Sequence, residues 1–182
     1  MSKWRCVAGF CRGEGATSTG PPACAATMSA TARKVTDLPL AILRLTAIYG
    51  ADDTHNSYGP NRFLRQALKD GRIPLFGNGE ETRDHLSVDD AVELILKVVS
   101  HGSTGLINLA SGKSATFRAV ADMVAARAGR PVEIVSSPRQ NPATHRHFDT
   151  TNLLRAFPGA RFRPLDDGLA TTLAKMGAEA GA

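Results

Sequence analysis

The segment of residues 38–49, LPLAILRLTAIY, constrains the fold more than any other part of the chain, because apolar residues follow one another in it with little interruption. A strand with one face in water alternates apolar and polar residues, whereas a strand covered on both faces does not. β-Branched residues stand toward the end of the segment, and Gly50 follows it. The segment therefore predicts a strand buried on both faces, as in parallel sheets.

Helical patterns and short strands alternate after this segment. Residues 61–70 are expected to form a helix, and Gly71 is suited to follow its C-terminus. Residues 73–76 are expected to form a short strand, after which Gly-Asn-Gly at positions 77–79 supplies the positive backbone angles of a tight turn. Further strands are expected at residues 106–110 and 132–135. This alternation of strands and helices indicates an α/β fold.

Four more helix starts are indicated by polar capping residues. Asp89 is suited to cap a helix whose buried stripe would hold Val88, Ala91, Val92, Ile95 and Val99. Thr116 is suited to cap the next helix, with a buried stripe of Phe117, Val120, Ala121, Val124 and Ala128. Asp149 is expected to cap a short helix, and Asp166 or Asp167 to open the last one.

Composition and charge exclude several classes of partner. The net charge of the 182 residues is +5, but Lys and Arg are scattered and aromatic residues make up only 5%, so we expect no nucleic-acid partner. No apolar run approaches the length of a membrane span. Cys6, Cys11 and Cys24 match no zinc spacing and are odd in number, which favours a reducing, cytoplasmic location. His145 and His147 are interpreted as a surface pair, and no metal site is predicted.

The N-terminal segment, residues 1–36, differs in composition from the rest of the chain. It is rich in Ala, Gly, Ser and Thr, lacks apolar periodicity and carries one acid, Glu14. Such a composition is typical of a disordered tail or of a start that does not belong with the rest, and a transit peptide is the alternative. We therefore expect a disordered or mismatched segment at residues 1–36 and a folded part at residues 37–178.

Patterns for other nucleotide-binding loops are incomplete. Gly112-Lys-Ser114 follows a predicted strand, but the first glycine that a phosphate loop requires would fall at Ile107. The glycines at positions 77 and 79 begin a Gly-x-Gly-x-x-Gly pattern that Thr82 interrupts. No Gly-x-Ser-x-Gly nucleophile elbow occurs either.

Four segments follow one another along the chain in this order: LPLAILRLTAIYG, IPLFGNGEETRDHLSVDDAVELI, LINLASG, and a Pro-Arg pair before an Asp-capped helix. Together they resemble the C-terminal half of NAD-dependent epimerases/dehydratases, the extended short-chain dehydrogenase/reductase family. The resemblance covers residues 37–176. It implies the last strand region of a Rossmann-like sheet plus a small α/β substrate-binding domain.

The resemblance also implies two substrate-binding residues. In the family, the Arg of the Arg-Asp pair binds the diphosphate of a sugar nucleotide, and this role falls to Arg83, whose planar guanidinium can hold phosphate oxygens bidentately. A surface ion pair with Asp84 or Glu80 is the alternative. Arg139 stands at the position of a second phosphate-side Arg. The Asn with which many members contact a sugar nucleotide is Ala47 here.

No catalytic residue is predicted. The family uses a Tyr-x-x-x-Lys pair to move a proton and NAD or NADP to carry hydride, but the corresponding residues 16–27 contain neither Tyr nor Lys. Tyr49 and Tyr58 are followed four residues later by Asp53 and Arg62. The glycine-rich cofactor loop is absent as well, so no cofactor-binding residue is assigned.

Three hypotheses remain open at this point. The chain is a truncated epimerase/dehydratase that keeps mainly the substrate-binding half, with a start set by a shifted frame or a wrong initiation codon. Alternatively, it is a stand-alone, non-catalytic binding module for nucleotide-linked ligands. In the third hypothesis a separate Rossmann subunit completes it. The family also suggests a homodimer.

Overall fold

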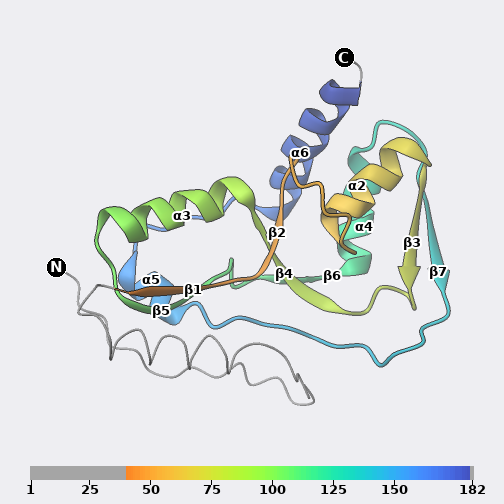
Figure 1. Ribbon diagram of the computed structural model, residues 1–182. Helices are drawn as coiled ribbons and strands as arrows, with labels where there is room; N and C mark the ends of the chain where they lie inside the picture. Colours follow the sequence, from red (N-terminus) through yellow and green to blue (C-terminus); the bar gives the residue numbers. More distant parts are fainter. Residues whose placement is uncertain (1–39, 181–182) are drawn as a thin grey trace.

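The computed structural model describes residues 40–180, and over this range strands and helices alternate as the sequence predicts (Figure 1). The expectations for residues 1–36, including those for the three cysteines, lie outside the described residues, as does Leu38. None of the described helices is both long enough and apolar enough to cross a membrane.

Three small sheets carry the strands. In the first sheet, β1 (Ala41–Leu45) pairs in parallel with β5 (Gly105–Leu109). In the second, β4 (Thr82–Ser87) is central, parallel to β2 (Ala47–Tyr49) and antiparallel to β6 (Ser114–Thr116). In the third, β3 (Arg72–Phe76) is parallel to β7 (Glu133–Ser137).

The helices enclose two hydrophobic cores. The first core lies among α2 (Pro60–Lys69), α4 (Phe117–Arg127), α6 (Leu165–Ala180) and β3, and contains Phe63, Leu64, Ile73, Val120 and Leu169. The second core lies among α3 (Val88–Ser100), α5 (Thr151–Ala156) and β5, and contains Leu94, Val98, Ile107, Leu109 and Leu153. Figure 1 shows these groups at opposite ends of the molecule, joined by β2 and β4.

The single buried strand predicted for residues 38–49 is wrong in two respects. It is two strands, β1 and β2, which pair with different partners and are separated at Thr46. The Thr46 hydroxyl donates to the carbonyl of Asp84 at 2.6 Å, and its amide donates to Leu109 at 3.1 Å. β1 is only half-buried, and Leu45 is exposed, because among the described residues β1 has a neighbour, β5, on one edge only.

The helix predicted after Asp89 exists, but its cap and buried face were wrong. Ser87 is the N-cap, and its hydroxyl accepts from the amide of Asp90 at 3.2 Å. Asp89 lies in the first turn instead, with a carboxylate oxygen 3.2 Å from a guanidinium nitrogen of Arg163. The buried apolar residues of α3 are Ala91, Leu94 and Val98. Val88, Val92 and Val99 are exposed and Ile95 is partly buried, so Ala91 alone of the predicted stripe is fully buried.

The first core follows the sequence more closely. α2 carries Phe63, Leu64 and Ala67 inward, as predicted for residues 61–70. The hydroxyl of Thr116 caps α4 by accepting from Ala119 at 3.0 Å. The predicted stripe Phe117, Val120, Ala121 and Val124 is buried and Ala128 partly so. β4 and β6 were not predicted.

Candidate functional site

A glycine turn positions the first part of the site. Gly77 and Gly79 join β3 to β4 with φ values of 59° and 78°, as predicted from the sequence. A Cβ on Gly77 would lie 2.7 Å from a carboxylate oxygen of Glu80, and a Cβ on Gly79 would lie 2.7 Å from the amide nitrogen of Arg118. Both the backbone angles and the close packing therefore require glycine, and the turn delivers Glu80 and Glu81 next to β4.

The strand β4 fixes Arg83 through its neighbour Asp84. The Asp84 side chain is fully buried, and it accepts from the amide of Ser111 at 3.0 Å and from the Ser111 hydroxyl at 2.9 Å. Because side chains alternate along a strand, Arg83 lies on the opposite side of β4 from Asp84. Arg83 therefore does not pair with Asp84, and among the described acids its ion-pair partner is Glu81.

Arg83 is anchored by the segment around Thr144. One guanidinium nitrogen donates to the carbonyl oxygens of Thr82 at 2.8 Å and Thr144 at 2.5 Å, and the other donates to the Thr144 hydroxyl at 2.8 Å. The second nitrogen also lies 3.8 Å from a carboxylate oxygen of Glu81. The Arg83 side chain is 18% exposed, and burial lowers its pKa. The group is thus held in a defined position at the edge of the surface.

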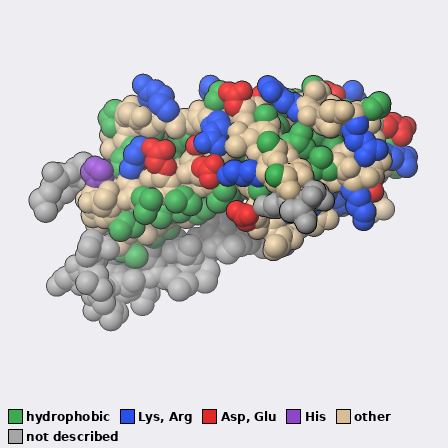
Figure 2. All heavy atoms as spheres, turned by 90° about the horizontal axis from the view of Figure 1, so that it is seen from above, with side chains coloured by type: hydrophobic (Ala, Val, Ile, Leu, Met, Phe, Trp, Pro, Cys, Tyr) green, Lys and Arg blue, Asp and Glu red, His purple; other side chains and the backbone are tan. Residues whose placement is uncertain are grey.

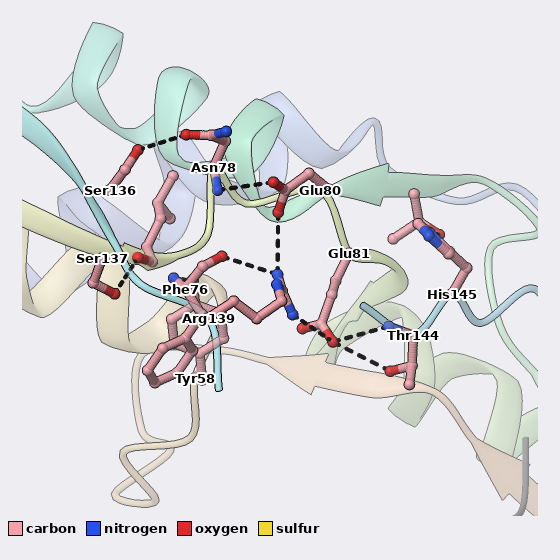
Figure 3. Close-up of polar contacts among 12 residues, drawn as sticks. Tyr58, Phe76, Asn78, Glu80, Glu81, Ser136, Ser137, Arg139, Thr144 and His145 are labelled. Atoms are coloured by element: carbon pink, nitrogen blue, oxygen red, sulfur yellow. Dashed lines mark hydrogen bonds and ion pairs between the residues drawn. The ribbon is translucent and has the colours of Figure 1, made fainter. Parts of the chain in front are cut away.

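Arg139, in the segment after β7, approaches Glu81 as Arg83 does, and it also approaches Glu80. One of its guanidinium nitrogens donates to the Phe76 carbonyl at 2.9 Å and to Glu80 at 3.2 Å. The other lies 3.3 Å from Glu81 (Figure 3). The structure thus brings together the two arginines that the sequence predicts as substrate-binding residues, which are 56 positions apart.

Glu81 is the point at which the two arginines meet. Its Oε1 atom is the one that lies near both Arg83 and Arg139, and it also accepts from the amide and hydroxyl of Thr144 at 3.1 and 3.2 Å. Burial raises the pKa of this carboxyl, but the hydrogen bonds from Thr144 and the two positive charges outweigh burial, and the net pKa is lowered. We call Arg83, Arg139, Glu81 and Thr144 the anion site.

Aromatic rings border the anion site. Tyr58 accepts a hydrogen bond from the Phe76 amide at 3.0 Å, and the centroids of the two rings lie 4.8 Å apart. Phe76 is 49% exposed although it ends a strand of the first core. The guanidinium carbon of Arg83 lies 5.8 Å from the centroid of Phe117. A half-exposed residue, Phe76, therefore lies beside Arg139, whereas the ring beside Arg83, Phe117, is buried.

His85 follows two residues after Arg83 on the same side of β4, and sequence reasoning did not single it out. It is 5% exposed, and neither ring nitrogen has a hydrogen-bond partner within the described part of the chain. Burial, followed by the charge of Arg83, lowers its pKa to about 4. At neutral pH it is an uncharged ring whose centroid lies 5.9 Å from that of Phe117.

A cavity of about 430 Å³ opens at the other end of β4. It is lined by Ile48, Tyr49, Gly50, Asp52, Asp53 and Val88. Tyr49 is opposite Ser87 in the β2–β4 register, so the cavity is four residues, or about 13 Å, along β4 from Arg83. Its two aspartates make it a poor place for an anion. The anion site is therefore the better candidate for holding a negatively charged ligand.

The remaining candidates carry no site within residues 40–180. No group of three or more His, Cys, Asp or Glu residues among them is arranged to hold a metal ion. His145 and His147 are both exposed, and His145 exchanges a hydrogen bond of 3.0 Å with the Thr82 hydroxyl.

Comparison with known proteins agrees with the resemblance. Residues 23–110 match the NAD dependent epimerase/dehydratase family; the match begins inside the segment 1–36. The chain is 34% identical to dTDP-L-rhamnose 4-epimerase of Burkholderia thailandensis over 53% of this chain and 28% of that protein. It is 31% identical to dTDP-glucose 4,6-dehydratase of Streptomyces griseus over 65% of this chain and 40% of that protein.

The fold agrees as well. The UDP-glucose 4-epimerase of Thermus thermophilus, solved in complex with NAD, superposes with a TM-score of 0.73 at 22% identity, over 84% of this chain and 51% of that one. The chain spans less than half the length of the two curated relatives and about half of the solved one. The predicted α/β fold and the relation to NAD-dependent epimerases and dehydratases are confirmed.

Proposed function

We propose, from this relation to NAD-dependent epimerases and dehydratases, that the chain binds the diphosphate of a nucleotide sugar at the anion site. The observation that carries the proposal is the convergence of Arg83 and Arg139 on one carboxylate oxygen of Glu81, at 3.8 and 3.3 Å. Two guanidinium groups within ion-pair distance of a common acceptor position are suited to adjacent phosphate oxygens.

The surroundings suit a nucleotide better than a simple anion. The exposed ring of Phe76 adjoins Arg139, whose guanidinium donates to the Phe76 carbonyl. Aromatic faces accept nucleobases by stacking, and this stacking tolerates different bases. The arrangement therefore supports a ligand with an aromatic base at one end and negative charge next to it.

The chemical step of the relatives would need a Tyr-x-x-x-Lys pair, which this sequence does not contain. Neither Tyr49 nor Tyr58 has a lysine four residues later. Tyr49 is buried, and burial together with the charge of Asp90 raises the pKa of its phenol to about 12, which makes it a weak proton donor. We therefore assign binding, and no catalytic role, to the described residues.

The described residues do not form a site that suits NAD or NADP. The sequence has no Gly-x-Gly-x-x-Gly turn between a strand and a helix, the usual cradle for the pyrophosphate. The cavity at the carboxyl end of β2 presents Asp52 and Asp53, which disfavour a phosphate. No step of the proposed function is therefore assigned to the cofactor.

A second candidate function is that of a subunit completed by a separate Rossmann-like chain. Two observations favour it. β1 has β5 as its neighbour on one edge only within residues 40–180, and α3 presents Val92, Leu96 and Val99 to solvent. A further parallel strand beside β1, with its helix beside α3, would cover both surfaces.

Calorimetric titration with UDP and with dTDP tests the proposed binding. We expect Arg83→Lys to weaken binding roughly tenfold, because an ammonium cannot replace a two-pronged guanidinium. Arg127→Lys is the matched control, since Arg127 pairs with Asp166 on α6. Wild-type protein that binds neither nucleotide would refute the proposal.

A further inference from the structure

Glu81 occupies the position in the anion site at which a ligand oxygen would find its donors. Four groups surround its Oε1 atom: the guanidinium groups of Arg83 and Arg139, and the amide and hydroxyl of Thr144, at distances of 3.1 to 3.8 Å. Charged and neutral donors of these types are the ones that hold phosphate oxygens in proteins.

The neighbouring carboxylate, Glu80, does not share this position. Its side chain is 49% exposed, against 15% for Glu81, and among the arginines it pairs only with Arg139. Its other contacts are local, including a hydrogen bond from the Asn78 amide at 3.0 Å. Glu80 is therefore an ordinary turn residue with one ion pair, whereas Glu81 lies among the donors of the anion site, of which Figure 3 shows Arg139 and Thr144.

The charges explain why an internal carboxylate is present. Burial, and after it the positive charges of Arg146 and Arg139, lower the pKa of Arg83, whereas the charge of Glu81 raises it. Arg83 and Arg139 repel each other, and the negative charge of Glu81 between them offsets this repulsion. Glu81 thus neutralises the pair while no ligand is bound, whereas hydrogen bonds to Thr144 and to the Phe76 carbonyl hold Arg83 and Arg139 in place.

We propose that Glu81 is an internal competitor for the anion site: a ligand phosphate displaces its carboxylate and takes over the same donors, so that Glu81 sets the affinity. This inference rests on the proposed nucleotide binding. No covalent bond is made or broken, because one anion replaces another at the same hydrogen-bond donors. Neutralising Glu81 must then tighten nucleotide binding.

Titration of UDP into Glu81→Gln by calorimetry tests the competition. Glutamine keeps the length of the side chain and an oxygen that can accept from Thr144, but loses the charge, so we expect UDP to bind about tenfold more tightly than to wild type. Glu93→Gln makes the same change of net charge on α3, where Glu93 pairs with Lys97, and is expected to leave the affinity unchanged. We expect Glu80→Gln to change the affinity for UDP less than Glu81→Gln does.

The outcomes separate this inference from the proposed function. Wild type that binds UDP, loses affinity in Arg83→Lys and gains it in Glu81→Gln supports both. Equal or weaker binding by Glu81→Gln, when Arg83→Lys still weakens it, overturns the competition and leaves the binding site intact. If neither wild type nor Glu81→Gln binds UDP, both fall. Equal thermal melting of Glu81→Gln and wild type, followed by circular dichroism, excludes a folding defect as the cause of a loss.

Discussion

The two cores of the molecule differ in how completely the chain covers them. In the first core, Phe63, Leu64 and Ile73 are fully buried among three helices. Around the second core, the apolar surface continues outward: of the seven large apolar side chains that are exposed among the described residues, five lie on β1 and α3. Figure 2 shows apolar side chains gathered along the side of the molecule where α3 lies.

The proposed anion site and the exposed apolar surface lie on different parts of the molecule. The anion site lies beside the covered core, where β3, β4 and β7 hold its residues through many polar contacts. The α3 surface presents apolar groups in a row that a single helix cannot bury by itself. Within residues 40–180, the proposed anion site therefore lies beside the covered core, and the exposed apolar surface lies on the other part.

The largest expected effect is a loss of stability on opening the first core. Phe63→Ala should reduce the free energy of unfolding by about 3–5 kcal/mol, because it removes a fully buried ring that contacts Tyr58 and Phe117. Leu96→Ala, on the exposed face of α3, should change it by no more than about 0.5 kcal/mol. Urea unfolding followed by circular dichroism measures both. A comparable loss in Leu96→Ala would mean that another surface covers α3 in solution.

A smaller effect is expected from acid. The pKa of His85 falls from its ordinary 6.5 to about 4 in the folded protein, so the unfolded chain binds a proton first as the pH decreases. The contribution of His85 to the free energy of unfolding is therefore fully present above pH 6.5. About 3 kcal/mol is lost from this group as the pH falls toward 4.

Unfolding in urea between pH 7 and pH 4 measures this loss. His85→Phe, which cannot take up a proton, should flatten the curve, and His147→Gln, at an exposed histidine, should leave it as in wild type. Identical pH dependence in His85→Phe and wild type would show that His85 is not the buried neutral group described above.

How far the sequence predicted the structure depends on whether the signal was local. The cap Thr116 and the turn at residues 77–79 depend on neighbours a few positions away, and both were predicted. β4 was missed because its sequence, TRDHLS, is polar except for Leu86. Its burial depends on Ser111, 27 residues away, whose amide and hydroxyl satisfy Asp84.

The face of α3 shows a different limit. Apolar residues occur almost all round this helix, so the spacing of Val88, Val92 and Val99 fitted a buried stripe as well as Leu94 and Val98 did. Only the packing against β5 and α5 decides between the two. The resemblance to the family pointed to Arg83 and Arg139, but their common contact with Glu81 depends on the path of residues 138–144 and could not be read from spacing.

A double-mutant cycle on nucleotide binding decides whether the two arginines hold one ligand. UDP affinity is measured for wild type, Arg83→Gln, Arg139→Gln and the double variant. Residues that hold the same diphosphate should lose less together than the sum of their separate losses, with a coupling of at least about 1 kcal/mol. Additive losses, or no loss in either single variant, would contradict a shared anion site at Arg83 and Arg139.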